Sequence, residues 1–215
     1  MSDAARYLVV LDADSTLIEQ EVIELLAEAA GSLDLVAEVT DRAMRGEIDF
    51  AVSLRERVAT LAGLPTEVFD DVGRVIRPTT GVQELIDGLH ANGHRVGVVS
   101  GGFHELLDPI AGRLGLDHWR ANRLEVENGR LTGGLIGPII DASAKAHALQ
   151  EWSAADGIPL CSTVAIGDGA NDLTMMRVAG LGVAFNAKPI VRRAADLVVG
   201  GRDLSQVLPL LGLRG

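Results

Sequence analysis

The hydrophobic pattern opens with a continuous apolar run of strand length at 7–11. Because its apolar residues do not alternate with polar ones, the run is typical of a strand buried on both faces of a parallel sheet. Runs at 94–100 and 163–167 have the same character, and shorter apolar runs at 182–185 and 196–199 predict two further strands. The pattern thus predicts buried strands spread over the length of the chain.

Helical spacing separates these strands. The clearest stripe of apolar residues at three- and four-residue intervals ends at Gly93 and consists of Val82, Leu85, Ile86 and Leu89. Strands that alternate with helices predict an α/β fold with a doubly wound, mostly parallel sheet. In such a sheet ligands bind beyond the carboxyl ends of the strands.

Residues 17–76 differ from the rest because only helical spacing is found there. One stripe, closed by Gly31, consists of Val22, Leu25, Leu26 and Ala29; a second, closed by Gly63 and Pro65, consists of Phe50, Leu54, Val58 and Leu61. We therefore predict a helical cap domain at 17–76, inserted into an α/β core domain formed by 1–16 and 77–215. A smaller excursion at 124–132 contains Asn-Gly, the strongest two-residue signal for a hairpin.

Composition and charge exclude several classes of protein. With 47% apolar and 23% charged residues the chain can bury enough surface to fold, and no apolar run is long enough to span a membrane. A net charge of −11 argues against nucleic-acid binding, which needs a basic patch. The start shows no export signal, and the single cysteine, Cys161, fits a reducing compartment and a small core residue. We expect a cytoplasmic protein without membrane or nucleic-acid partners; the oligomeric state is not readable from the sequence.

Acidic residues mark the end of the first strand. Asp12 and Asp14 are separated by one residue where an α/β sheet presents its ligands. Capping of the helix that follows would equally explain an Asp-Ser-Thr cluster, because all three residue types cap helices. Taken alone, this pair favours neither explanation.

Two further strand ends carry polar residues. Ser100 and two glycines follow the apolar residues 96–99, and they offer a hydroxyl and backbone amides to an anion. Residues 163–166 are followed by Gly167, Asp168, Gly169, Ala170, Asn171 and Asp172. Ordinary glycine turns are the alternative for both segments.

Lys145 is the candidate residue of the fourth segment. It falls in the first turn of a helix that Asp141 or Ser143 caps, where the helix dipole disfavours a positive charge. A placement that breaks a local rule indicates a functional role, and a solvated surface lysine is the alternative. Together the four segments contain what phosphoryl transfer needs: a carboxylate nucleophile, a second carboxyl group for proton transfer, acids for Mg²⁺, and a hydroxyl with an ammonium for the phosphoryl oxygens.

In this order and with these neighbours, the four segments resemble the motifs of the haloacid dehalogenase superfamily. The resemblance covers nearly the whole chain, and within the superfamily it is to the phosphoserine phosphatases. It implies a Rossmann-like core with an inserted helical cap, and a phosphomonoesterase that works through an aspartyl-phosphate. The implied reaction is hydrolysis of O-phospho-L-serine to serine and phosphate, the last step of serine biosynthesis.

The resemblance also implies a role for each site residue. Asp12 would be the nucleophile and Asp14 the general acid and base. Mg²⁺ would be bound by Asp12, Asp14 through its backbone carbonyl, and Asp168, with Asp172 in support. The implied substrate-binding residues are Glu21, Phe50, Arg57, Ser100, Gly101, Lys145 and Asn171. The cap would close over the substrate and exclude water.

Helical spacing gives evidence on Arg57 that does not depend on the resemblance. Phe50, Leu54 and Arg57 share a helical face, so Arg57 points along an apolar surface and needs an anionic partner, either a structural acid or a substrate carboxylate. Glu21 could be an ordinary surface acid. Because the strand begins at residue 7, we expect no N-terminal regulatory domain.

Two alternatives to a phosphoserine hydrolase remain open. A related phosphatase or phosphotransferase would pass the phosphoryl group from phosphoserine to another alcohol such as homoserine. A non-enzymatic module that holds a phospho-aspartate would use a similar acidic cluster, Mg²⁺ and lysine. Asp14 and the cap argue against such a module, because a switch requires neither.

Overall fold

A seven-stranded sheet forms the centre of the computed structural model, which describes residues 6–213. Residues 1–5, where no export signal is predicted, lie outside the described residues. The strand order is β4-β3-β2-β1-β5-β6-β7, and all neighbours are parallel except β3 and β4. The strands are β1 Leu8–Leu11, β2 Arg95–Phe103, β3 His118–Glu127, β4 Arg130–Ile136, β5 Thr163–Gly167, β6 Leu181–Phe185 and β7 Leu197–Val199. The predicted doubly wound, mostly parallel sheet is confirmed.

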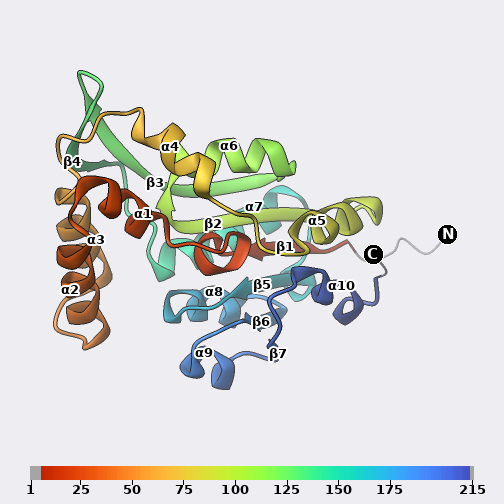
Figure 1. Cartoon of the computed structure of the whole chain (residues 1–215). Coiled ribbons are helices and arrows are strands. Elements are labelled where there is room, and N and C mark those ends of the chain that lie inside the picture. Colours follow the sequence, from red (N-terminus) through yellow and green to blue (C-terminus); the bar gives the residue numbers. More distant parts are fainter. Residues whose placement is uncertain (1–5, 214–215) are drawn as a thin grey trace.

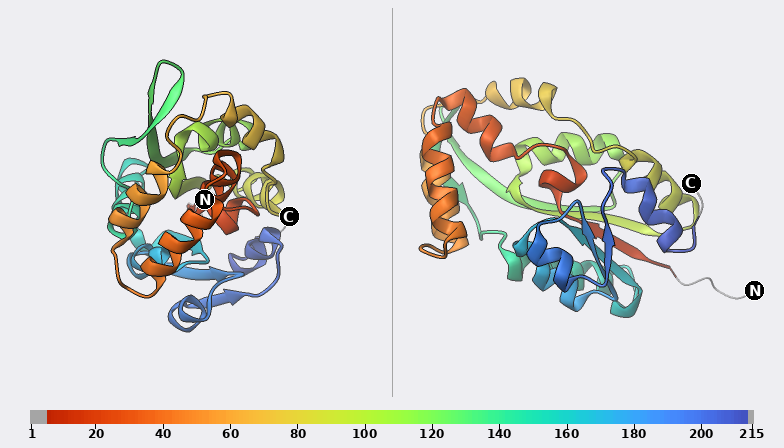
Figure 2. Two further views of the ribbon diagram at one scale, coloured as in Figure 1. Left: turned by 60° about the vertical axis from the view of Figure 1, so that its left-hand side comes forward. Right: turned by 60° about the horizontal axis from the view of Figure 1, so that its bottom comes forward.

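Helices cover both faces of this sheet (Figures 1 and 2). They are α1 Val22–Ala30, α2 Leu33–Met44, α3 Phe50–Ala59, α4 Val68–Val75, α5 Val82–Ala91, α6 His104–Leu114, α7 Ala142–Ala155, α8 Leu173–Val178, α9 Pro189–Ala194 and α10 Val207–Leu210. Alternate residues of β1 point to opposite faces of the sheet. Val9 and Leu11 pack in one hydrophobic cluster with residues of α5, α6 and α10. Leu8 and Val10 pack in a second cluster with residues of α7, α8 and α9. Burial on both faces explains the unbroken apolar runs in the sequence.

The chain changes direction across the sheet at β1. It runs outward through β2, β3 and β4 on one side of β1, and returns to begin β5, β6 and β7 on the other side. This arrangement is a topological switch point, where the carboxyl ends of neighbouring strands open a crevice. The segments that follow β1, β2 and β5 therefore meet at one place.

Residues 17–76 contain α1 to α4, as the helical spacing predicts. Helices α1, α2 and α3 lie beyond the carboxyl ends of the central strands, whereas α4 lies beside α6 (Figure 1). Apolar residues of this segment, including Leu26 and Leu54, belong to the same hydrophobic cluster as Val9 of the sheet. The domain boundaries at 16 and 77 stay a prediction.

The β3–β4 hairpin turns at Asn128 and Gly129, whose φ angles are +52° and +73°. These left-handed conformations are those of the two-residue turn that Asn-Gly predicts. The hairpin also contacts the segment after α3: Gly63 N donates to Leu131 O (2.8 Å), Leu131 N donates to Leu64 O (2.9 Å), and Thr66 N donates to Gly129 O (3.0 Å). The sequence analysis did not predict this attachment.

Two local expectations need correction. Cys161 is exposed rather than a core residue, because it lies in a short helical turn, Leu160–Ser162, just before β5 enters the core. Strand β2 continues past Ser100 to Phe103. No helix among residues 6–213 is long and apolar enough to cross a membrane.

Candidate active site

A wide turn follows β1 and fixes Asp12. Leu17 N donates to Asp12 O (3.3 Å) and Ile18 N to Ala13 O (3.0 Å), so the turn closes through five-residue hydrogen bonds. Ser15 adopts a left-handed conformation within it, with φ of +57°. The Asp12 carboxylate is buried, and its Oδ1 accepts a hydrogen bond from Ala13 N (2.7 Å). The turn thereby holds Asp12 at the end of the central strand.

Lys145 lies between two carboxylates. Its Nζ is 2.7 Å from Asp12 Oδ1 and 2.8 Å from Asp172 Oδ1, and its side chain is 0% exposed. Burial alone would lower the pKa of Lys145, but Asp12 and Asp172 raise it, so the side chain is an ammonium. The alternative of a solvated surface lysine is therefore wrong. The two carboxylates offset the unfavourable position in the first turn of α7, which Asp141 caps through Ala144 N (2.8 Å).

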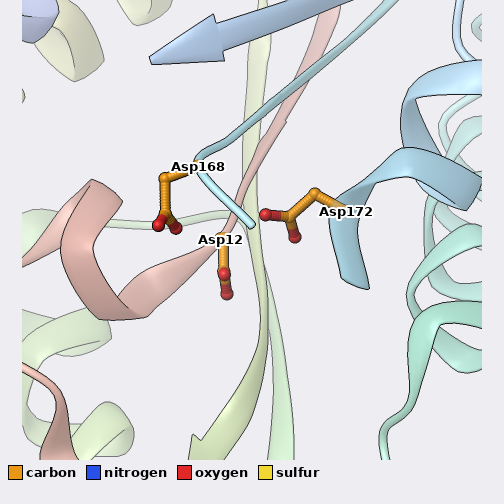
Figure 3. Close-up of side chains that lie close together, drawn as sticks. All are labelled: Asp12, Asp168 and Asp172. Atoms are coloured by element: carbon orange, nitrogen blue, oxygen red, sulfur yellow. The ribbon is translucent and has the colours of Figure 1, made fainter. Parts of the chain in front are cut away.

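Asp12, Asp168 and Asp172 converge from two segments (Figure 3). One carboxylate oxygen of each lies within 4.8 Å of the others. Burial, and then the charge of Asp172, raise the pKa of Asp12 to about 7 and that of Asp168 to about 6. Lys145 pairs with Asp12 and Asp172 but not with Asp168, and three carboxylates this close together are an excess of negative charge that suits a divalent cation with oxygen ligands. The donor set thus fits Mg²⁺.

Asp172 differs from the other two acids because both its oxygens have protein partners. Oδ1 accepts from Lys145 Nζ, and Oδ2 accepts from Gly169 N (3.0 Å). Gly167 leaves room for it, since a Cβ there would meet Asp172 Oδ2 at 2.3 Å. We infer that Asp172 mainly orients Lys145 and the loop after β5.

The Asp14 side chain points into the same region. Its Oδ1 is buried without a hydrogen-bond partner among the described residues, and Asp14 lines the main pocket with Asp12. Burial, and then the charges of Glu21 and Asp12, raise the pKa of Asp14 well above its ordinary value. A carboxyl group that stays protonated beside a carboxylate has the property that a general acid requires.

Ser100, Gly101 and Gly102 bulge out of β2. Val99 pairs with Arg120 and Phe103 with Asn122 on β3, so three residues of β2 stand opposite one residue of β3. The Ser100 hydroxyl oxygen accepts a hydrogen bond from Gly102 N (2.8 Å). Gly101 and Gly102 line the pocket. Because glycines form the bulge, its backbone can approach a bound anion closely.

These groups surround a cavity of about 640 Å³ between the sheet and the helical segment. Its wall includes Glu21, Phe50, Arg57 and Asn171, as well as Asp12, Asp14 and Asp168. The structure therefore brings together most of the predicted site residues in one cavity. Lys145 and Ser100 do not line this cavity: Lys145 is fully buried, and Ser100 lines a small adjacent pocket together with Asp14.

Arg57 is a half-buried cation in this cavity. Burial lowers its pKa, and the nearby charges of Glu21 and Asp14 oppose that effect. No carboxylate among residues 6–213 lies within the 4.0 Å of an ion pair with Arg57, whose Nε donates to Ser53 O (3.3 Å). Glu21 accepts a hydrogen bond from Ser15 Oγ (2.7 Å) and is not an isolated surface acid. A structural acid for Arg57 is thus absent from the described residues, which favours an anionic ligand as its partner.

Among the pocket residues that were not predicted from the sequence, Ser53 and Lys188 carry polar side chains near the predicted site residues. Ser53 lies on the face of α3 that carries Phe50 and Arg57, and its buried hydroxyl has no partner among the described residues. The helical spacing used for Arg57 would have found it. Lys188 lines the rim, and its backbone N donates to Asp168 O (3.0 Å). A lone lysine after a strand gave no comparable signal.

Comparison with known proteins agrees with this geometry. The sequence model of the haloacid dehalogenase-like hydrolase family matches residues 9–177. The phosphoserine phosphatase of Streptomyces coelicolor is 56% identical over 97% of this chain, which spans about half (51%) of that protein. The phosphoserine phosphatase of Lactococcus lactis is 52% identical, with 95% of both chains covered.

A solved structure gives the same result. The structure of a phospho-aspartyl intermediate analogue of phosphoserine phosphatase superposes with a TM-score of 0.90 at 42% identity, and covers 96% of this chain and 99% of the other. The predicted resemblance is confirmed. This chain belongs to the haloacid dehalogenase-like hydrolases, and within them to the phosphoserine phosphatase family.

Proposed function

We propose that this chain hydrolyses O-phospho-L-serine to serine and phosphate, the last step of serine biosynthesis, in the cytoplasm. The observation that carries the proposal is one cavity lined both by Asp12, which pairs with the buried Lys145, and by Arg57, which has no ion-pair partner among residues 6–213. The first supplies a nucleophile, and the second suits the carboxylate of an amino-acid ester. The names of the relatives and the phospho-aspartyl analogue support the same reaction.

Asp12 would attack the phosphorus atom. Its Oδ1 is held by Ala13 N and Lys145 Nζ, which leaves Oδ2 for attack. As the bond from Oδ2 to phosphorus forms, the bond from phosphorus to the serine oxygen breaks, and Asp14 donates its proton to that oxygen. Asp14, now a carboxylate, then takes a proton from the water that attacks the aspartyl-phosphate, and Asp12 is released.

The phosphoryl oxygens would lie between the β2 bulge and Lys145. The Ser100 hydroxyl, the Gly101 amide and the Lys145 ammonium would offset their charge. Mg²⁺ would be held by Asp12, the backbone carbonyl of Asp14 and Asp168, with Asp172 and Asn171 in support. The cation supplies positive charge to an otherwise acidic pocket.

The amino-acid part of the substrate would face the helical segment. Arg57 would bind its carboxylate, Glu21 its ammonium group, and Phe50 would pack beside them. Phe50 lies directly over the bulge, since a Cβ at Gly101 would meet Phe50 Cζ at 3.1 Å. The phosphoryl group and the amino-acid part of the substrate would thus each meet groups of complementary charge, after the strands and in the helical segment respectively.

A panel of phosphate esters, assayed with and without Mg²⁺, tests this function. We expect many turnovers on phosphoserine, strict dependence on Mg²⁺, and weaker activity on esters without the amino-acid group. Adding homoserine as an acceptor distinguishes hydrolysis from transfer, because a transferase would form phosphohomoserine in place of free phosphate. A single stoichiometric phosphorylation without turnover would instead identify a phosphate-responsive module.

Replacement of Asp12 by Asn tests the nucleophile. Asn keeps the size of the side chain but cannot form an acyl-phosphate, so we expect phosphate release to fall by at least about a thousandfold. The folded state is checked by circular dichroism. Substantial residual turnover by the folded variant would contradict the assignment.

A further inference from the structure

The bulge of β2 leaves backbone carbonyls without partners from the strand ladder. Ser100, Gly101 and Gly102 stand opposite a single residue of β3, so the regular pairing stops at Val99 and resumes at Phe103. A buried carbonyl without a hydrogen bond is costly, so these groups need another donor. The donor is a side chain from β3.

Asn122 fills this gap. Its Nδ2 donates to Gly101 O (2.8 Å) and is 3.3 Å from Gly102 O, and its Oδ1 accepts from Ile140 N (2.8 Å). The side chain is 2% exposed. One buried amide therefore joins the phosphate-facing bulge to the residue that precedes Asp141, the cap of α7.

The bond to Gly101 O has a consequence on the other side of the same peptide unit. In a trans peptide the C=O and N–H groups point in opposite directions. With Gly101 O held by Asn122, the Gly102 N–H points away from Asn122, toward Ser100 Oγ (2.8 Å). The Ser100 oxygen accepts this bond, so its own hydroxyl hydrogen stays available for a phosphoryl oxygen.

The bond to Ile140 N acts on the second element. Helix α7 begins at Ala142, two residues later, and Lys145 lies in its first turn. Ser100 and Lys145 come from different segments and must both face one phosphoryl group. Asn122 is the side chain that bonds to both segments.

We propose that Asn122 is a positioning residue for phosphoryl binding: it orients the Gly101–Gly102 peptide, and through it the Ser100 hydroxyl, relative to Lys145. It does not touch the substrate. This inference rests on the proposed function only in placing the phosphoryl group between Ser100 and Lys145. It adds a residue of β3 to a site otherwise formed after β1, β2 and β5 and in the helical segment.

The variants Asn122→Ala and Asn122→Asp test the proposal. Ala removes all three contacts, whereas Asp keeps the acceptor toward Ile140 N and loses the donor toward Gly101 O. We expect both to lower kcat by about 10- to 100-fold, since small misplacements of catalytic groups have effects of this size. The loss should be equal for phosphoserine and for a small chromogenic phosphate ester, and inhibition by inorganic phosphate should weaken.

Leu124→Ala is the matched control, because Leu124 lies on the same strand and is also 2% exposed but contributes only packing. It should lower the unfolding midpoint and leave kcat and phosphate inhibition within about twofold. Asn122 variants that are folded and keep wild-type kcat and phosphate inhibition would overturn the proposal. An equal loss of kcat in Leu124→Ala would do so as well.

A measurement on the unmodified protein covers the case in which the variants do not fold. In NMR spectra, the side-chain amide protons of Asn122 should exchange slowly with solvent, and their signals should shift when inorganic phosphate and Mg²⁺ are added. The signals of the exposed Asn92 should not shift. Unchanged Asn122 signals at saturating phosphate would contradict the proposal. Wild-type activity on the chromogenic ester without activity on phosphoserine would reject the proposed substrate, and the role of Asn122 would still be tested on that ester.

Discussion

At the scale of single residues, two cationic side chains of the candidate site, Lys145 and Arg57, differ in burial and in their partners. Lys145 is fully buried and bonded to two acids, so it belongs to the folded framework of the site. Arg57 lines the cavity and has no acid within ion-pair distance among the described residues. In the folded chain Lys145 is thus already paired with acids, whereas Arg57 has no such partner among the described residues.

We expect Arg57→Ala to lower kcat/KM for phosphoserine by about 100-fold or more, because a charge-assisted bond to the substrate carboxylate is lost. The effect on a small chromogenic phosphate ester should be within about threefold. Arg55→Ala is the matched control, since Arg55 lies on the same helix but is exposed. Equal losses on both esters would show that Arg57 supports the fold instead.

For Lys145, stability is the informative quantity. Lys145→Met leaves Asp12 and Asp172 buried without their cation, which should lower the free energy of unfolding by about 3 kcal/mol without Mg²⁺. Urea unfolding measures this change. Lys188→Met, at the exposed rim, should change it by less than about 0.5 kcal/mol. Similar values for the two variants would show that the buried pairs contribute little.

Candidate site residues were predictable where they follow a strand end. Asp12 and Asp168 each come directly after a buried strand, and that placement is a local property of the sequence. The partners of Lys145 were not predictable in the same way, because they depend on how β1, β5 and α7 pack. The burial that raises the pKa of Asp14 likewise exists only in the folded chain.

At the scale of elements, the strands and helices were predicted well because their signals are local. Unbroken apolar runs mark β1 and β5, and Asn-Gly marks the turn of the β3–β4 hairpin. The end of β2 was placed too early, since Gly101 and Gly102 have the composition of a turn. Only the pairing of Phe103 with Asn122 continues the strand, and that pairing is a long-range contact.

Two glycines give opposite predictions at this scale. Gly129 has φ of +73°, so Gly129→Ala should lower the free energy of unfolding by about 1 kcal/mol. Gly112 lies in α6 with nothing within 4 Å of an added Cβ, so Gly112→Ala should raise it by about 0.5 to 1 kcal/mol. Urea unfolding of both variants checks the signs, and changes of the same sign would contradict the conformational argument.

At the scale of the whole molecule, the candidate active site and a second charged cluster lie at opposite ends of the central strands. Asp117 lies near the amino end of β2 and accepts hydrogen bonds from Val96 N (2.9 Å) and His90 Nε2 (2.9 Å), and it pairs with Arg95. Burial favours the neutral acid, but these bonds lower the pKa of Asp117 below its usual range. The cluster contributes to stability without contacting the cavity.

The lowered pKa of Asp117 makes the free energy of unfolding depend on pH. Because the pKa of Asp117 is lower in the folded state, its contribution is complete above the unfolded value of about 3.9 and is lost as pH falls through the folded pKa. Asp117→Asn should lose about 1 to 3 kcal/mol of unfolding free energy at pH 7, with a smaller deficit below about pH 4. Urea unfolding at both pH values measures the difference, and activity should be retained. A deficit independent of pH would contradict this account.

The net charge of −11 says little about the cavity, because its own acids together with Lys145 and Arg57 determine the local charge. The whole-molecule arrangement was predictable only in outline. Alternating elements indicated a doubly wound sheet with a helical insertion, but the attachment of 63–66 to the hairpin required the folded structure. Contacts between segments far apart in the sequence leave no local pattern.

That attachment changes how the helical segment can move. Two adjacent chain connections alone would let the helical segment rotate against the sheet as a rigid body. Backbone hydrogen bonds also attach this segment to the β3–β4 hairpin. With these three attachments, the helical segment can rotate only if one of them bends. The hairpin is a twisted ribbon that extends away from the sheet (Figure 1). A rotation that opens the cavity would therefore either carry the hairpin along with the helical segment or break these backbone hydrogen bonds.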